Sequence, residues 1–191
     1  MKYELIQTKT FIGLSQVRRL SDGELGGYVA SETNLSQEGN CWIADNAKAY
    51  GNAQVYGDAQ VYGNATLSDN AQIYGNARLS ENARVYGDAM VSDSARVYGN
   101  ASVYGDAKLY GEALCNSTLK AGNWPASPLF VQGSLHPCAN SSPGMLTIGC
   151  IEHAFEYWSI NLQEIGSDNG YSETQIKEYG RIIELFCKIG K

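Results

Sequence analysis

Alanine recurs at strict six-residue intervals through the middle of the chain. Twelve alanines follow one another at this spacing, from Ala47 to Ala113. An unbroken six-residue period is typical of a parallel β-helix, in which three hexapeptides form one triangular coil. The sequence therefore predicts a mainly β protein built on such a solenoid. β-Branched residues at one fixed phase of the repeat argue against a disordered low-complexity tract.

Each hexapeptide has the same internal order. An aliphatic residue stands four positions before most of the alanines, as Val55 does before Ala59, and it points inward while its two neighbours point outward. Glycine, two positions before most of the alanines, supplies the positive φ of the corner. This alternation of aliphatic and small residues predicts the left-handed type of β-helix, an exception to the right-handed rule for parallel crossovers.

The repeat defines the predicted domains. Extended backwards, the alanine phase reaches Cys41, Leu35 and Val29, so residues 25–122 are expected to form about five coils. The open end of a β-helix has to be covered. We therefore interpret residues 1–24, with strands at 2–7 and 11–20, as an N-terminal β cap.

Residues 123–191 have a different texture and are predicted to form a small C-terminal α+β unit. Strands are expected at 129–133 and 145–150, followed by a helix over about 152–165. A second helix is expected to open at Ser172, which forms a capping box with Gln175. The apolar stripes of this helical hairpin are Phe155, Trp158, Leu162 and Ile165 in the first helix and Ile176, Tyr179, Ile182, Ile183, Phe186 and Ile189 in the second.

Residues eighteen apart are expected to lie above one another on three outer faces. The first face carries Tyr50, Ser68, Tyr86 and Tyr104; the second carries Tyr56, Tyr74, Ser92 and Tyr110; the third carries Ala44, Tyr62, Ser80 and Tyr98. These tyrosine columns are interpreted as structural stacks that also suit an interface. Asn46, Asn64, Asn82 and Asn100 are predicted to form a hydrogen-bonded ladder along one corner.

The third face offers a candidate ligand site. Arg78 and Arg96 lie one coil apart there, beside Tyr62 and Tyr98. Guanidinium groups bind phosphate through paired hydrogen bonds and stack on aromatic rings, so this set predicts a site for a small anionic ligand such as a nucleotide. His153 and Trp158 of the C-terminal unit are predicted to complete the site. A solvated face without any ligand is the alternative interpretation.

A second candidate site concerns Cys150 and His153. A cysteine close to a histidine at a helix N-terminus can be an activated thiolate, or the two can bind a metal. A third ligand is missing, and a simple hairpin of 131–136 with 145–150 would place His136 opposite Met145, far from Cys150. The favoured interpretation is therefore a buried thiol and a capping histidine, with no metal and no cofactor.

Charge and cysteine content limit the partners and the compartment. The net charge of −6 and the pI near 4.9 argue against long nucleic acids, which require clustered lysine and arginine. The five cysteines are an odd number without a Cys-x-x-Cys pair, which predicts reduced thiols and a cytoplasmic location. The first residues lack the apolar region of a signal peptide, and no membrane-spanning run is found.

The repeat Val-Tyr-Gly-Asn/Asp-Ala resembles the hexapeptide-repeat proteins that phages and prophages encode. The resemblance extends to Leu25-Gly26-Gly27-Tyr28, to Gln132-Gly133-Ser134 with His136-Pro137, and to Ile148-Gly149-Cys150 followed by His153 and Trp158. It implies an origin in an infected or lysogenic bacterial host, but that group is mostly of unknown function. Leu135 stands where the group tends to have arginine, which counts against an anion site at the tail histidine. The broader left-handed β-helix family includes trimeric acyltransferases, and this likeness implies a homotrimer.

Three functions follow from these observations. The first is a phage-derived, non-catalytic binding protein, a homotrimer whose grooves sequester a small anionic ligand such as a nucleotide signal of host defence. The second is a structural or protein–protein interaction module whose tyrosine faces dock a partner. The third is a hexapeptide-repeat acyltransferase; the lack of any histidine and of any looped-out coil between Cys41 and Ala113 counts against it.

Overall fold

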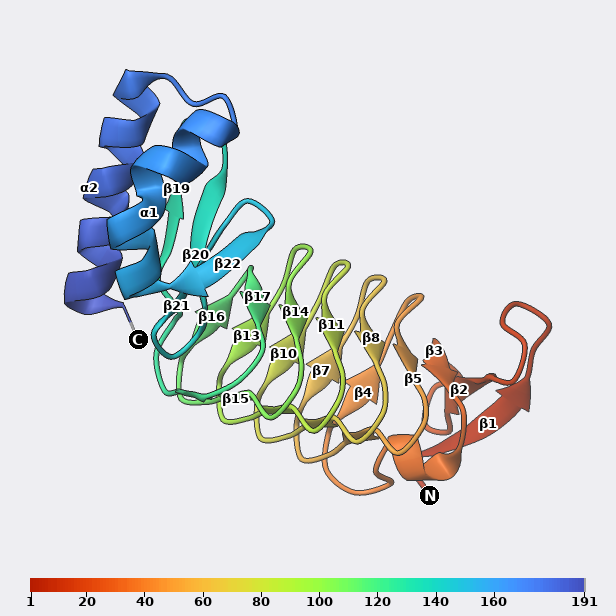
Figure 1. The fold of residues 1–191 in the computed structure, drawn as a ribbon. Helices are drawn as coiled ribbons and strands as arrows, with labels where there is room; N and C mark the ends of the chain where they lie inside the picture. The colour runs from red at the N-terminus through yellow and green to blue at the C-terminus, as the bar shows by residue number, and fades with distance from the viewer. Residues whose placement is uncertain (191) are drawn as a thin grey trace. The chain divides into compact units, whose positions relative to one another are not determined.

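The computed structural model describes residues 1–190, which divide into two compact units (Figure 1). The first, here called the solenoid unit, contains residues 1–116 and 120–127. The second, here called the C-terminal unit, contains residues 117–119 and the chain from residue 128 onwards.

The solenoid unit begins with an antiparallel pair of strands. β1 (Tyr3–Gln7) pairs with β2 (Ser15–Arg19), and β2 pairs in turn with β3 (Leu25–Val29). β3 then joins the parallel ladder of the solenoid, and the 3₁₀ turn η1 (Glu32–Asn34) follows it. The predicted cap strand at 2–7 is confirmed, whereas the one expected over 11–20 starts only at Ser15.

The coils are built from strands of two residues each, separated by tight corners. The first face consists of β5 (Lys48–Ala49), β8 (Thr66–Leu67), β11 (Arg84–Val85) and β14 (Ser102–Val103). The second consists of β6 (Gln54–Val55), β9 (Gln72–Ile73), β12 (Met90–Val91), β15 (Lys108–Leu109) and β18 (Asn123–Trp124). The third consists of β4 (Trp42–Ile43), β7 (Gln60–Val61), β10 (Arg78–Leu79), β13 (Arg96–Val97) and β16 (Leu114–Cys115).

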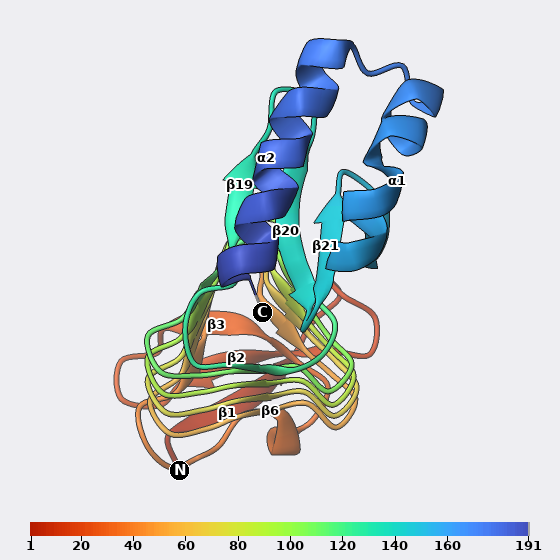
Figure 2. The same ribbon diagram turned by 60° about the vertical axis from the view of Figure 1, so that its left-hand side comes forward.

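Each face is a parallel sheet in which residues eighteen apart are direct neighbours. Thr66 pairs with both Lys48 and Arg84, and Arg78 pairs with Arg96. The predicted parallel β-solenoid of about five turns is confirmed, and Figure 2 shows its stacked coils from a second direction. Its handedness stays a prediction.

The interior and the corners follow the repeat. The alanines from Ala47 to Ala113 and the aliphatic residues before them are at most 1 % exposed. Most corners have a glycine with positive φ, as at Gly57 (68°), and four have an acidic residue in the same conformation, as at Asp69 (58°). The Asp69 carboxylate accepts a hydrogen bond from the Gly87 backbone N–H of the next coil at 3.0 Å. An aspartate can therefore replace a corner glycine because it gains a bond between coils.

Two side-chain ladders run along the column. The asparagine ladder is confirmed. The side-chain amide of Asn46 donates a hydrogen bond to that of Asn64 at 3.4 Å, and Asn64 donates to Asn82 at 3.2 Å. The predicted stacking of tyrosines is confirmed for two pairs, one on the first face and one on the second. The rings of Tyr86 and Tyr104 are parallel within 4° with centroids 4.8 Å apart, and the pair of Tyr56 and Tyr74 is equivalent at 4.9 Å.

The phase of the six-residue repeat shifts by two residues in the first coil. Cys41 occupies an alanine position as predicted, since its neighbour Trp42 pairs with Gln60. Leu35, however, pairs with Val55, and Val29 pairs with Ala49, so both fill aliphatic positions rather than alanine positions. The corner before Cys41 is two residues longer than the others, which shifts everything before it by two.

The C-terminal unit contains an antiparallel sheet and a helical hairpin. The sheet has the order β19 (Phe130–Gln132), β20 (Pro137–Ser142), β21 (Met145–Ile148) and β22 (Ile151–Ala154). The helices are α1 (Phe155–Asp168) and α2 (Glu173–Ile189), and α2 has the predicted capping box of Ser172 and Gln175. The short strand β17 (Thr118–Leu119) also belongs to this unit.

Two predictions for the C-terminal unit are wrong. Residues 151–154 form a strand, so the first helix starts three residues later than expected and His153 does not lie at its N-terminus. In the hairpin of β20 and β21, Met145 pairs with Ser142 and Ile148 pairs with Cys138. The strand preceding the turn is thus 137–142 rather than 131–136, because buried polar residues of β20 do not give the sequence the alternation of a strand.

Candidate functional site

The arginine pair of the third face lies as the sequence predicted. Arg78 of β10 and Arg96 of β13 are direct neighbours in the ladder, and both are exposed. Within residues 1–190 the ion pairs join Arg18 to Glu4 and Arg19 to Asp22 and Glu24, so neither arginine of the pair has a carboxylate partner. Both guanidinium groups are therefore free to meet an anion.

The two tyrosines beside this pair are not in contact with each other. Tyr62 and Tyr98 are separated by the coil that carries Ser80, and Ser80 is only 8 % exposed. Tyr62 is 38 % exposed. The third face therefore carries two adjacent exposed arginines, and its two tyrosines lie two coils apart with the buried Ser80 between them.

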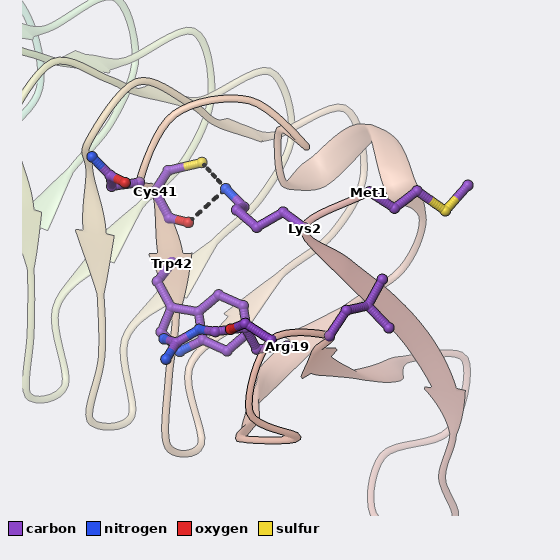
Figure 3. A pocket seen from close by; sticks show the side chains of 8 residues that line it. Met1, Lys2, Arg19, Cys41 and Trp42 are labelled. Carbon is purple, nitrogen blue, oxygen red and sulfur yellow. Dashed lines mark hydrogen bonds between the residues drawn. The ribbon is translucent and has the colours of Figure 1, made fainter.

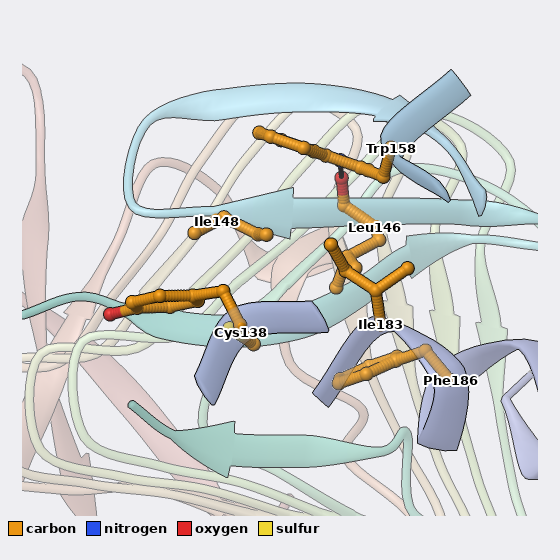
Figure 4. Close-up of a cluster of buried hydrophobic side chains, with 7 residues drawn as sticks. Cys138, Leu146, Ile148, Trp158, Ile183 and Phe186 are labelled. Carbon is orange, nitrogen blue, oxygen red and sulfur yellow. Dashed lines mark hydrogen bonds between the residues drawn. The ribbon is translucent and has the colours of Figure 1, made fainter. Parts of the chain in front are cut away.

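His153 and Trp158 belong to the C-terminal unit, whereas the other four residues predicted for the ligand site belong to the solenoid unit. Trp158 is 2 % exposed, and its indole N–H donates to the Leu146 carbonyl at 2.8 Å (Figure 4). It is thus a core residue. His153 of β22 lies on the Tyr157 ring, with centroids 4.2 Å apart, and against the edge of Trp158. That the six predicted residues share one ligand site stays a prediction.

The structure places Cys150 and His136 differently from the prediction. Cys150 lies in the turn between β21 and β22 and is exposed, so the expectation of a buried thiol is wrong. His136 lies beside Gly149, whose N–H donates to the Pro137 carbonyl at 3.0 Å; its predicted place opposite Met145 is therefore also wrong. Among residues 1–190, no group of three or more His, Cys, Asp and Glu side chains could hold a metal ion.

The side chain of Tyr179 holds the loop that carries His136 through hydrogen bonds. Its hydroxyl accepts hydrogen bonds from the backbone N–H groups of Leu135 at 3.0 Å and His136 at 2.6 Å. The Tyr179 side chain is completely buried. Burial raises the pKa of the neighbouring Tyr171 hydroxyl, and Tyr179 adds to this effect. The Tyr179 hydroxyl is therefore a structural hydrogen-bonding group.

The first face of the solenoid unit contains a groove that the sequence reasoning missed. It has a volume of about 380 Å³ and is lined by Lys48, Tyr50, Thr66, Ser68, Arg84, Tyr86 and Ser102. Lys48 and Tyr50 lie in one coil, Arg84 and Tyr86 lie two coils further on, and Ser102 lies in the coil beyond these. The two short hydroxyl residues of the coil between them form its floor. Two cations and two phenol rings thus surround a polar floor.

The charges around this groove favour an anion. Arg84 is exposed, and neither Arg84 nor Lys48 forms an ion pair within the described residues. The Lys48 ammonium lies 3.9 Å from the centre of the Phe11 ring. Asp69 lies at the adjoining corner, where its carboxylate is bonded to the Gly87 N–H. Burial raises the pKa of Tyr86, with a further contribution from the Tyr104 ring, so the hydroxyl of Tyr86 remains a neutral donor.

The groove is open because two adjacent outward positions are small. Thr66 and Ser68 are the two outward residues on either side of the inward Leu67. The corresponding partner of Ser80 is Arg78, and that of Ser92 is Met90. Ser80 and Ser92 are buried beside these long side chains, while Ser68 is partly exposed. From Lys48 to Tyr110, the pair of Thr66 and Ser68 is the only one in which both outward residues are short. That pair is the sequence signal that could have revealed the site.

A larger cavity of about 530 Å³ lies beside β1, β2 and β4 of the solenoid unit (Figure 3). Its cations are already engaged. The Lys2 ammonium donates to the Cys41 carbonyl at 2.9 Å and to its sulfur at 3.2 Å. Arg19 lies 4.4 Å from the centre of the Trp42 ring and is bonded to Asp22 and Glu24. This cavity is therefore a weaker anion site than the first-face groove.

These features define a β-solenoid repeat protein with a polar, cationic groove on one face. The family model described as the YdcK beta solenoid repeat matches residues 71–85 and 83–97. The chain is thus similar to that repeat over the central coils, which agrees with the observed solenoid. The comparison with curated proteins found no match. Among the described residues, 1–190, none of the helices has the length and hydrophobicity that a transmembrane span requires.

Proposed function

We propose that this protein is a non-catalytic binding protein whose first-face groove holds a small anionic ligand. The observation that carries the proposal is the arrangement of Lys48 and Arg84 at the two ends of a floor made of Thr66 and Ser68. Two separated cations and short hydroxyl side chains suit an anion of the size of a nucleotide, since cations and hydroxyls both donate to phosphate oxygens.

The wider setting belongs to the same proposal. The chain is of phage origin, it forms a homotrimer in the host cytoplasm, and it sequesters a nucleotide signal of host defence. The phage part is supported by the repeat and by the resemblance of its flanking motifs. Native mass spectrometry of the purified chain measures the subunit number and any retained small molecule together, and a monomer without ligand would contradict this setting.

A binding experiment with matched variants tests the groove. Isothermal titration with cyclic dinucleotides, ADP-ribose and AMP is done on the native chain, on K48Q/R84Q and on R78Q/R96Q. Each double variant removes two positive charges from one face, so their difference reports position rather than total charge. We expect K48Q/R84Q to lose binding and R78Q/R96Q to keep it. The reverse result would move the site to the third face, and absence of binding to the native chain would overturn the proposal.

A structural or protein-docking module is the second candidate. Tyr50 and Tyr62 are 39 % and 38 % exposed, and exposed tyrosines suit protein interfaces. Recovery of one stoichiometric protein with the native chain, and its loss with Tyr62→Ser, would support this function over small-molecule binding.

A further inference from the structure

The tyrosine stack of the first face lacks one ring. Tyr86 and Tyr104 lie in successive coils with ring centroids 4.8 Å apart, and the chain continues this column through Ser68 to Tyr50. Because Tyr50 and Tyr86 lie two coils apart, their places in the column are about 9.6 Å apart, twice the spacing of neighbouring strands. Serine leaves that interval without a ring.

An interval of this size matches one aromatic ring. A planar ring halfway between Tyr50 and Tyr86 would lie about 4.8 Å from each along the column, which is the spacing of neighbouring strands. The paired tyrosines of this solenoid have the same spacing, with centroids 4.8 and 4.9 Å apart and planes within 4°. The geometry points to a ligand ring that takes the place of the missing tyrosine.

We propose that the first-face groove binds a nucleotide whose base inserts between Tyr50 and Tyr86 above Ser68. This inference rests on the proposed function and specifies the class of ligand. A base stacks between aromatic side chains through its π faces. The phosphate then meets Lys48 or Arg84, each of which lies two residues before one of the two tyrosines, and the hydroxyls of Thr66 and Ser68 face its sugar.

The other two interruptions explain why there is one such site in each chain. Ser80 and Ser92 also interrupt tyrosine columns, but they are 8 % and 7 % exposed. Ser68 is partly exposed and lines a groove. The second face therefore provides a control position for the first, with the same serine followed by the same type of acidic corner residue, Asp93 in place of Asp69.

The test combines three probes with two variants. Isothermal titration of the native chain uses AMP, adenosine and ribose 5-phosphate, which carry the ring and the phosphate, the ring alone and the phosphate alone. Ser68→Tyr restores the missing ring and should occupy the slot, whereas Ser92→Tyr makes the same change on the second face. We expect one AMP per chain, binding about tenfold tighter than ribose 5-phosphate. Ser68→Tyr should abolish AMP binding and Ser92→Tyr should leave it unchanged.

Each failure has its own signature. Equal binding of AMP and ribose 5-phosphate would overturn the stacked base and leave the anion site intact. Adenosine binding as tightly as AMP would contradict the anion site and leave the ring slot. AMP binding that survives Ser68→Tyr would overturn the groove as the site. No binding of any of the three probes would overturn both inferences. Circular dichroism of Ser68→Tyr and Ser92→Tyr confirms that both fold, so a loss of binding reports the slot.

Discussion

In the solenoid unit every coil buries the same small side chains, whereas the C-terminal unit buries one large and irregular cluster. A typical coil contributes an alanine such as Ala83 and an aliphatic residue such as Val85 on each face. The cluster of the C-terminal unit contains Trp158, Tyr179 and Phe186, all at most 2 % exposed. Stability in the first unit is thus spread over many equal contributions, and in the second it is concentrated in a few residues.

Polar groups show the same contrast. Asparagines and corner aspartates of the solenoid bond to the equivalent place one coil away, as Asn64 does to Asn82. In the C-terminal unit, Trp158 and Tyr179 bond to backbone groups of segments distant in sequence. A change in the solenoid should therefore act on neighbouring coils, and a change at one of these aromatic residues should act on the whole C-terminal unit.

The largest effect is expected for Trp158→Ala. The variant removes a buried indole and the hydrogen bond to Leu146, so the C-terminal unit should lose about 3–5 kcal/mol of stability. Tyr157→Ala, at a neighbouring residue that is 46 % exposed, is the matched control and should have a much smaller effect. Hydrogen exchange with mass spectrometry should show lost protection in residues 138–186 and unchanged protection in residues 71–97. Equal loss in both would contradict the contrast between the units.

Overpacking the solenoid should have a smaller effect. Ala83 is completely buried at an inner corner, and Ala83→Leu adds three carbon atoms at that position. We expect a loss of about 1–3 kcal/mol, measured by urea unfolding. Lys108→Leu, an outward position of β15, is the control and should be near neutral. An Ala83→Leu variant as stable as the native chain would show that the inner corner is not close-packed.

The periodic part of the chain was predictable because its phase determines each environment. The six-residue period predicts the register of Arg78 with Arg96, the asparagine ladder and the buried alanines. Leu35 and Val29 were wrongly predicted to occupy alanine positions. The corner before Cys41 is two residues longer than the others, and its amino-acid composition does not reveal this extra length. The groove was not predicted because charged residues alone do not mark it; its decisive feature is the shortness of Thr66 and Ser68.

The C-terminal unit was predictable as a set of elements but not as a register. Its helices follow from their apolar stripes and from the capping box at Ser172. β20, however, contains Asn140 and Ser141, which are buried at 0 % and 1 % exposure. Such a polar strand reads as a loop, and only contacts with β19 and β21 show that it lies in the sheet. His136 was misplaced for the same reason.

Corner aspartates test how far neighbouring coils depend on one another. Asp69→Ala removes the hydrogen bond to the Gly87 N–H and places alanine at a positive φ, so we expect a loss of about 1–2 kcal/mol. Asp69→Asn keeps an acceptor and a residue that tolerates this conformation, and should remain close to the native chain. Thermal unfolding of both variants measures the difference. A loss of equal size in both would assign the role to the charge of Asp69 instead.

The smallest effect concerns the buried thiol of the C-terminal unit. Burial raises the pKa of Cys138 from 9.0 to about 12, with a smaller contribution from Glu178. The folded unit therefore holds the neutral thiol while the unfolded chain ionises, so this stability is present below pH 9 and is lost as the pH rises towards 12. Between pH 7.5 and 9.5, the free energy of unfolding of the native chain should therefore fall by about 1 kcal/mol more than that of Cys138→Ala. Urea unfolding at both pH values measures this difference, with Cys187→Ala at an exposed thiol as the control. An identical pH dependence in the native chain and Cys138→Ala would show that solvent reaches this thiol and that the core of the C-terminal unit is looser than its packing indicates.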